Sequence, residues 1–218
     1  MLQAITVTDT LNSWLCPVCT VVEAVVNRFI THALPDWIAS NGQPLNANGG
    51  LCPLHAQTLL RWASPIGIAA MYPCLLEQAA EMLKCWQQLG TPPPLRPSPL
   101  RPRCLVCAEQ RKAEIAAITE LLNLLLTDEG RDAYAKGRGV CLPHFCQLWR
   151  RTSGDLRRWL LQTQIHQLRQ LSADLRSYRQ KREALRRQDI TPAEETAWVT
   201  AVEILAGHLP SMAMPEPR

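Results

Sequence analysis

A duplicated set of cysteine and histidine pairs constrains the fold of this 218-residue chain more than any other feature. Each copy contains a Cys-x-x-Cys followed by a Cys-x-x-His. The copies are Cys16-Pro-Val-Cys19 with Cys52-Pro-Leu-His55, and Cys104-Leu-Val-Cys107 with Cys141-Leu-Pro-His144. The four positions recur at offsets of 88, 88, 89 and 89 residues, which indicates an internal duplication with a single insertion.

The repeat predicts two tandem domains and a connecting linker. We expect one repeat in residues 1–90 and the other in 104–188, with a C-terminal helix and tail in 189–218. The linker, 91–103, is rich in proline, which favours an extended polyproline II spacer over a helix or a central strand.

The composition favours an all-α fold, because leucine is far more common than the β-branched valine and isoleucine. In each repeat we expect an amphipathic helix after the Cys-x-x-Cys, a polar loop, and a short helix opened by the Cys-x-x-His. The loops would be Asn41–Gly50 and Asp128–Gly139. A third helix would follow a Ser N-cap, over Ile66–Leu89 in one repeat and from Asp155 to about Gln188 in the other.

A last helix is predicted from Thr191, which starts a capping-box pattern with Pro192 at the first turn and Glu194 three residues on. We expect this helix to end at Gly207 and to bury its apolar residues, which are Trp198, Val202 and Leu205.

The ligand types predict two zinc sites. A structural zinc ion takes four tetrahedral ligands, and three cysteines with one histidine form a standard set. A cysteine at a helix N-terminus is also easier to ionise, because the helix dipole favours the thiolate. Sequence order favours pairing within each repeat: Cys16, Cys19, Cys52 and His55 in one site, and Cys104, Cys107, Cys141 and His144 in the other.

Three other interpretations could account for the cysteines. An iron–sulfur cluster with Cys₃His ligation is the main rival, and it would make the chain a redox or electron-transfer protein. A thioredoxin-like pair needs a βαβ context that the sequence lacks, and simple burial of small apolar cysteines does not explain the spacing with histidine.

The other cysteines and histidines receive structural interpretations. Cys74 and Cys85 have no counterparts in the second repeat, so we expect them in the core. Cys146 could replace a ligand, but the repeat does not support it. The three remaining histidines stand alone and are not expected to be ligands: His32, His166 and His208.

The motifs resemble a family of uncharacterised bacterial proteins known only as a domain of unknown function. The resemblance rests on the Cys-Pro-x-Cys at Cys16, the Gly-x-Cys-x-x-His at Gly50, and a degenerate second copy. It spans nearly the whole chain and implies the eight ligand-type residues, but no activity. The second copy departs from the first in the order Leu142-Pro143, which leaves the ligands unchanged.

The sequence does not predict an enzyme. It lacks a phosphate-binding loop, a dinucleotide-binding glycine pattern, a nucleophile elbow and a His-Glu-x-x-His motif. It also lacks a signal peptide and an apolar run of membrane-spanning length, so we expect a cytoplasmic protein without membrane contact. The partner is then expected to be another protein in an interaction or regulatory role.

A concentration of arginine suggests nucleic acid as an alternative partner. Residues 147–188 contain eleven Lys or Arg against three acids, in a chain whose net charge is +4. We expect a basic helix over 155–188 that packs through Leu161, Ile165, Leu168 and Leu175 and leaves the core near Tyr178. The candidate contacts are Arg158, Arg169, Arg176, Arg179, Arg182, Arg186 and Arg187. The alternative is a solvated face paired with acids such as Glu194 and Glu195.

Overall fold

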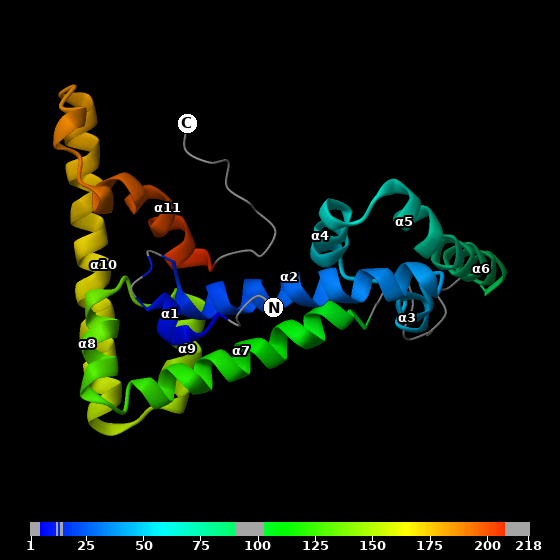
Figure 1. Ribbon diagram of the computed structural model, residues 1–218, viewed down its shortest axis with the longest axis horizontal. Coiled ribbons are helices and arrows are strands. Elements are labelled where there is room, and N and C mark those ends of the chain that lie inside the picture. The colour runs from blue at the N-terminus through cyan, green and yellow to red at the C-terminus, as the bar shows by residue number, and fades with distance from the viewer. Residues whose placement is uncertain (1–4, 12, 14, 90–102, 208–218) are drawn as a thin grey trace. The chain divides into compact units, whose positions relative to one another are not determined.

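The computed structural model describes residues 5–11, 13, 15–89 and 103–207. Within them it contains eleven α-helices, one 3₁₀ helix and no strand, which confirms the all-α prediction (Figure 1). The chain divides into two compact units, one of Met1–Ala24 with Ala113–Leu209 and the other containing Val25–Lys112. None of the described helices is both long enough and apolar enough to span a membrane. The expected linker 91–103 lies, except for Arg103, outside the described residues.

The unit containing Val25–Lys112 is built from most of α2, four further helices and the first part of α7. The bounds are α2 Pro17–Ala39, α3 Gln43–Ala47, α4 Pro53–Trp62, α5 Pro65–Met71, α6 Pro73–Leu89 and α7 Leu105–Leu124. Two expectations are corrected here. The polar loop 41–50 contains the short helix α3, and the third helix of the repeat is split into α5 and α6, because Pro73 starts a new helix after Tyr72.

The other unit contains α1, the start of α2, the rest of α7 and all later helices. The bounds are α1 Val7–Thr10, α8 Asp128–Lys136, α9 Leu142–Arg151, α10 Gly154–Glu183, the 3₁₀ helix Arg187–Asp189 and α11 Pro192–Ala206. The loop expected at 128–139 is mostly α8, whose Thr127 N-cap accepts the backbone N–H of Gly130 at 3.0 Å. The basic helix ends at Glu183, before the predicted Gln188.

Helix α11 packs against α10 with a face that the sequence analysis did not select. Its buried residues include Ala197 and Ile204, which meet Leu171 of α10. The prediction that Trp198, Val202 and Leu205 are buried is wrong, since their exposed fractions are 52%, 65% and 59%. The small side chain of Ala197 allows a close helix–helix approach, whereas a tryptophan at that interface would hold the helices apart.

The predicted apolar stripe of α10 is only partly correct. Leu168 and Leu175 pack against α11 as expected, but Leu161 and Ile165 are exposed. The buried face instead consists of Leu160, Gln164, Gln167 and Leu171. Two glutamines therefore face inward, because they bind the backbone ahead of α9.

An ion pair joins the C-terminal part of α10 to the start of α11. Lys181 Nζ lies 2.8 Å from both carboxylate oxygens of Glu194. Glu194 also completes the predicted capping box, accepting the backbone N–H of Thr191 at 2.8 Å. Hydrogen bonds from Lys181, Ser177 and Thr191 lower the pKa of Glu194 from 4.5 to about 2.

This pKa gives a pH-dependent prediction for stability. A carboxylate whose pKa is lower in the folded state stabilises the fold above its unfolded pKa, and the contribution is lost as the pH falls. Glu194→Gln should therefore lower the melting temperature at pH 7, and the difference from wild type should shrink between pH 4.5 and pH 2. The control is Glu195→Gln at an exposed neighbouring position. A Glu194→Gln effect that is the same at pH 7 and pH 3, measured by circular dichroism, would contradict this account.

Candidate metal centres

All four sequence motifs lie at helix N-termini. In each one the carbonyl oxygen of the first cysteine accepts the backbone N–H of the residue four positions on, which is the first hydrogen bond of the helix, at 2.8–3.2 Å. These N-cap cysteines are Cys16, Cys52, Cys104 and Cys141. The predicted placement of the motifs at helix starts is confirmed, and it keeps the sulfur atoms close to the positive end of each helix dipole.

A glycine with positive φ sets the direction of each Cys-x-x-His helix. Gly50 has φ of 95° and Gly139 has φ of 76°, and each lies two residues before the N-cap cysteine. Such angles strain any residue with a Cβ atom. The Gly-x-Cys pattern that the two repeats share therefore marks a turn that requires glycine just before each Cys-x-x-His helix.

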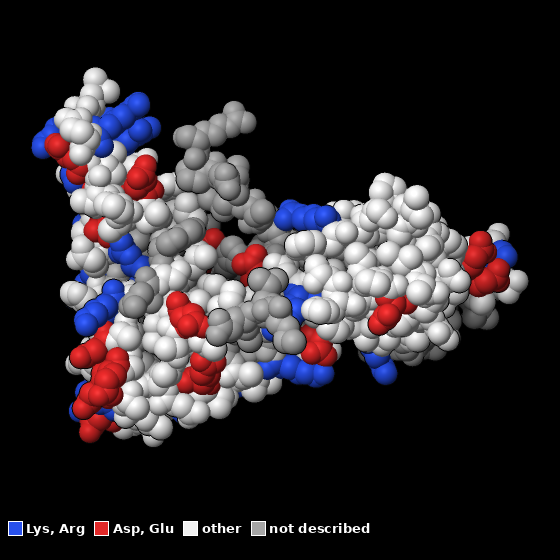
Figure 2. Space-filling model, in the orientation of Figure 1, with Lys and Arg blue, Asp and Glu red and all other residues white. Residues whose placement is uncertain are grey.

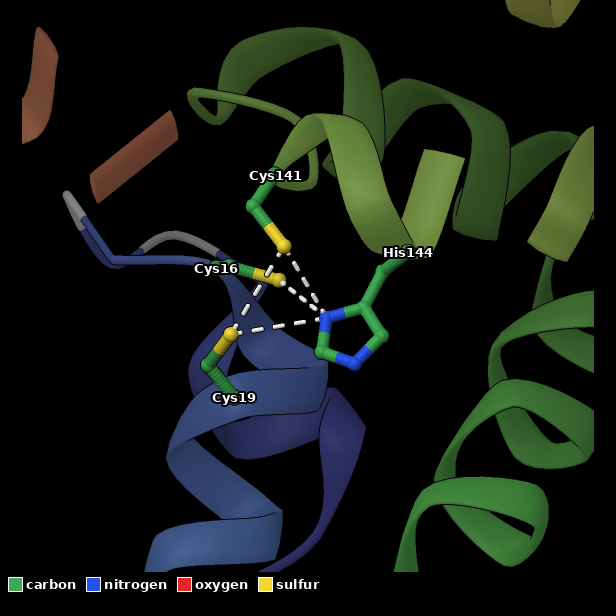
Figure 3. Close-up of side chains that lie close together, drawn as sticks. All are labelled: Cys16, Cys19, Cys141 and His144. Carbon is green, nitrogen blue, oxygen red and sulfur yellow. Dashed lines mark hydrogen bonds between the residues drawn. The ribbon is translucent and has the colours of Figure 1, made fainter. Parts of the chain in front are cut away.

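Cluster 1 is formed by Cys16 and Cys19 at the start of α2 and by Cys141 and His144 at the start of α9. The side chains point toward one another from the two helix starts (Figure 3). His144 Nδ1 lies 3.5, 3.4 and 3.1 Å from the sulfurs of Cys16, Cys19 and Cys141, respectively. The sulfurs of Cys19 and Cys141 are 3.7 Å apart, and all four residues are buried.

Cluster 2 joins Cys104 and Cys107 at the start of α7 to Cys52 and His55 at the start of α4. His55 Nδ1 lies 3.2, 3.4 and 3.3 Å from the sulfurs of Cys52, Cys104 and Cys107, respectively. The Cys52 and Cys107 sulfurs are 3.6 Å apart. The same atom types thus meet at nearly the same separations in both clusters.

The grouping of the ligands corrects the prediction made from sequence order. Each Cys-x-x-Cys meets the Cys-x-x-His of the other repeat, and not that of its own. The physical reason lies in the helices α2 and α7, which follow the Cys-x-x-Cys motifs. Each helix carries the chain out of one compact unit and into the other, so its Cys-x-x-His is delivered to the other unit.

The separations within each cluster fit a single tetrahedral ion. With zinc–sulfur bonds of about 2.3 Å and zinc–nitrogen bonds of about 2.0 Å, a tetrahedron has edges of about 3.8 Å between sulfurs and about 3.5 Å between sulfur and nitrogen. The observed sulfur–sulfur and sulfur–nitrogen distances lie within a few tenths of an ångström of these edges. Both clusters could therefore hold metal ions.

The electrostatics of cluster 1 also suit a cation. Burial opposes ionisation of Cys16, but hydrogen bonds from Cys141 and Cys19 and the His144 ring outweigh it and hold the pKa of Cys16 well below its ordinary value. The hydrogen bonds to Cys141 and Cys16, with burial, raise the pKa of Cys19. Ionisation is thus favoured at Cys16 and opposed at Cys19, and a divalent cation between the sulfurs would remove that conflict.

The two histidines differ in what supports the nitrogen that points away from the sulfurs. His144 Nε2 lies 3.0 Å from Oε1 of Glu114, an oxygen that also accepts a 2.6 Å hydrogen bond from Gln147. A carboxylate in this place orients a metal-binding imidazole and strengthens it as a donor. The buried Nε2 of His55 has no hydrogen-bond partner in the described structure. Burial lowers the pKa of His55, and the nearby Gln110 side chain opposes this shift without reaching Nε2 in hydrogen-bond geometry.

Two buried glutamines, which the sequence analysis missed, hold the backbone leading into α9. Gln164 donates to Val140 O at 3.0 Å and accepts from the Tyr134 hydroxyl at 2.9 Å. Gln167 donates to Tyr134 O at 2.8 Å. Their spacing on the buried face of α10 was a usable signal, whereas nothing in the sequence pointed to Glu114.

The other cysteines and histidines that the structure describes lie outside both clusters. The prediction that Cys74 and Cys85 belong to the core is wrong, because Cys74 is exposed and Cys85 is half-buried. Cys146 is exposed as well. Of the histidines expected not to be ligands, His32 and His166 are exposed, while His208 is outside the described residues.

The arginines singled out on the basic helix are all exposed, and Figure 2 shows blue side chains beside red ones at the C-terminal end of α10. Some are paired with acids: Arg158 with Asp155, Arg179 with Glu183, and Arg186 with Asp189. Arg182 stacks over the Tyr178 ring at 5.9 Å. Within the described part of the chain, four of these arginines form no ion pair with an acid: Arg169, Arg176, Arg182 and Arg187.

The turn at Gly139 gives a testable prediction. A Cβ atom there would clash with Gln167 Oε1 and lie 2.7 Å from Gln164 Oε1, in addition to the strain of its positive φ. Gly154 also has positive φ, but a Cβ atom there would meet nothing within 4 Å. Gly154→Ala should cost about 1 kcal/mol of unfolding free energy from strain alone. Gly139→Ala should cost about 1–3 kcal/mol more, because of overpacking. Equal losses in urea denaturation would contradict the crowding argument.

Comparison with models of protein families, with curated proteins and with solved structures gives no match for this chain. The resemblance to an uncharacterised bacterial family therefore stays a prediction based on the motif residues.

Proposed function

We propose that the chain is a zinc-binding helical protein whose two Cys₃His sites each hold one structural zinc ion. The observation that carries the proposal is the convergence of four donor atoms, all within 4.8 Å of one another, in each of two clusters. Cysteine and histidine together are the donor set that zinc prefers in structural sites. Chance burial of thiols does not account for two such sets with the same Nδ1 donor.

The donor spacing favours one ion over an iron–sulfur cluster. A cluster with two or four irons is bound through different iron atoms, so its protein ligands lie farther apart than the ligands of a single ion. In each cluster one sulfur–sulfur pair, 3.7 Å apart in cluster 1 and 3.6 Å apart in cluster 2, matches the edge of a tetrahedron around one metal, and all donor atoms lie within 4.8 Å of one another. Iron–sulfur chemistry remains the alternative that elemental analysis excludes or establishes.

The proposed sites are structural and not catalytic. Four protein ligands complete the tetrahedron and leave no position for water or substrate. The apparent binding free energy of structural zinc is on the order of 10 kcal/mol, comparable with the stability of a whole domain. The thiolate ligands need a reducing compartment, which agrees with the expected cytoplasmic location. A scaffold held by structural zinc would serve an interaction or regulatory role with a protein partner.

Metal counting in paired cysteine variants tests both the metal and the crosswise grouping. Cys16→Ser with Cys141→Ser disables cluster 1 alone, so the zinc content of the soluble protein should fall from two ions per chain to one. Cys16→Ser with Cys52→Ser disables both clusters, so the content should fall to none. The two double variants remove the same number of thiols and serve as controls for each other. The measurement is inductively coupled plasma mass spectrometry of purified protein.

If Cys16→Ser with Cys141→Ser instead lowers the zinc content to none, and Cys16→Ser with Cys52→Ser lowers it to one ion, the ligands pair within each repeat. A wild-type protein without zinc that still melts cooperatively would contradict the proposal altogether. Iron in place of zinc, with a brown colour after anaerobic purification, would establish the iron–sulfur alternative.

A second candidate function is binding of nucleic acid by the arginine-rich helix α10. The observation that favours it is the exposure of all the candidate arginines, four of which form no ion pair with an acid in the described residues. Guanidinium groups free of internal ion pairs can neutralise phosphates and release counterions. The pairs at Arg158, Arg179 and Arg186 and the Lys181–Glu194 ion pair reduce this charge and favour the solvated-face alternative.

Salt-dependent DNA binding discriminates between these alternatives. Fluorescence anisotropy with duplex and single-stranded DNA at low salt should detect binding that weakens as salt rises. Replacing Arg176, Arg179, Arg182 and Arg186 by Gln should lower the slope of log affinity against log salt by about 3–4. The control variant replaces the exposed Arg28, Arg61, Arg111 and Lys112 by Gln. No binding, or equal effects of the two variants, would leave α10 as a solvated or protein-docking face.

A further inference from the structure

The two clusters share their donor types but differ in how well the protein covers them. In cluster 1 the exposed fractions of Cys16, Cys19 and Cys141 are 4%, 6% and 0%. In cluster 2 only Cys104 is buried among the cysteines, whereas Cys52 and Cys107 are half-buried. Oxidants and competing ligands should therefore approach Cys52 and Cys107 of cluster 2 more readily than any cysteine of cluster 1.

The two half-buried cysteines of cluster 2 are also neighbours. Cys52 and Cys107 lie 3.6 Å apart and come from different helices, α4 and α7. The repeat makes them equivalent to Cys141 and Cys19, whose sulfurs are 3.7 Å apart in cluster 1. The protein thus contains two thiol pairs of the same spacing and chemistry, and burial is the main difference between them.

The contact of the outer ring nitrogen of the histidine also favours tighter metal binding in cluster 1. The Glu114 carboxylate 3.0 Å from His144 Nε2 strengthens the imidazole donor of cluster 1, whereas His55 Nε2 has no such partner in the described residues. Outer contacts of this kind typically change metal affinity by about 10–100-fold. Cluster 2 should therefore hold its ion less tightly, and its thiolates should be released for reaction more often.

We propose that Cys52 and Cys107 form an oxidation-sensitive thiol pair that reacts with hydroperoxides, and that their conversion to a disulfide releases the metal of cluster 2 while cluster 1 keeps its own. The proposal rests on the metal binding proposed above. It gives the two sites different roles: cluster 1 is a permanent structural site, and cluster 2 responds to peroxide.

The chemistry balances in two steps. First, one thiolate of the pair attacks the peroxide, so that a sulfur–oxygen bond forms, the oxygen–oxygen bond breaks, and a proton from water completes the alcohol or water that leaves. Second, the other thiolate attacks the resulting sulfenic acid, forming the sulfur–sulfur bond and releasing water with a second proton. The two sulfurs lose two electrons in total and the peroxide gains them. The metal ion leaves because two of its four ligands are lost.

Peroxide-driven metal release from the wild-type ligand set tests the proposal. The protein carries Cys74→Ser, Cys85→Ser and Cys146→Ser, which removes the three cysteines outside the clusters. Zinc content is measured before treatment. The zinc-loaded protein is then mixed with hydrogen peroxide and a chromogenic chelator that reports released zinc. One equivalent should appear about tenfold or more faster than the second, because reaction follows thiolate access.

Peptide mass spectrometry after the fast phase locates the disulfide. The expected product links Cys52 to Cys107, and dithiothreitol with added zinc should restore two ions per chain. Release of both ions at one rate, or a first disulfide between Cys19 and Cys141, would overturn the proposal. A release with Cys52 linked to Cys104 would also overturn it, since Cys104 is buried. If no zinc is bound before treatment, the proposed metal binding fails, and this outcome is distinct from equal release of two bound ions.

The roles of Glu114 and of burial can be separated with one variant. Glu114→Gln removes the carboxylate at His144 and leaves the cysteines of both clusters unchanged. Metal transfer from cluster 1 to the chelator without peroxide should become faster by about 10–100-fold, while cluster 2 should keep its rate. Peroxide should still form the Cys52–Cys107 disulfide first, because burial of the cluster 1 sulfurs is unchanged.

Discussion

The crowding of three sulfurs and one imidazole nitrogen around a single point is the interaction on which each unit depends. These atoms arrive from helix N-termini that lie 122–128 residues apart in the chain for cluster 1 and 49–55 residues apart for cluster 2. Without a cation, thiolates crowded together in a buried cluster would repel one another. A metal ion converts this repulsion into four bonds and closes long loops, so binding and folding become coupled.

The crosswise grouping of the motifs explains why the sequence repeats and the compact units do not coincide. The boundary between the units falls within α2 and within α7, each of which starts at one cluster and continues into the other unit. A fragment that contains only the first repeat would carry Cys16 with Cys19 and Cys52 with His55, which belong to different clusters. Neither repeat can therefore complete a metal site alone, although the duplication is easy to see in the sequence.

The sequence predicted the local chemistry well and the long-range pairing poorly. The helical class, the eight ligand-type residues and the motifs at helix starts follow from local signals such as the Gly-x-Cys turn and Pro at the first helical position. The Cys-x-x-His that each Cys-x-x-Cys meets depends on the direction in which α2 and α7 carry the chain. No local sequence pattern encodes that direction. The exposure of Trp198 and the burial of Gln164 were missed for a related reason, because the buried face of a helix depends on its neighbour. In α11 the small alanines face the neighbouring helix, and in α10 the glutamines face a loop whose backbone carbonyl groups need hydrogen-bond donors.

The most direct test of this account is a crystal structure with anomalous diffraction measured on both sides of the zinc absorption edge. The account predicts two single-atom peaks per chain, one bonded to Cys16, Cys19, Cys141 and His144 and the other to Cys52, His55, Cys104 and Cys107. Each peak should appear above the zinc edge and vanish below it. A peak that joins Cys16 and Cys19 to Cys52 and His55, multi-iron density, or no anomalous signal at either cluster would contradict it.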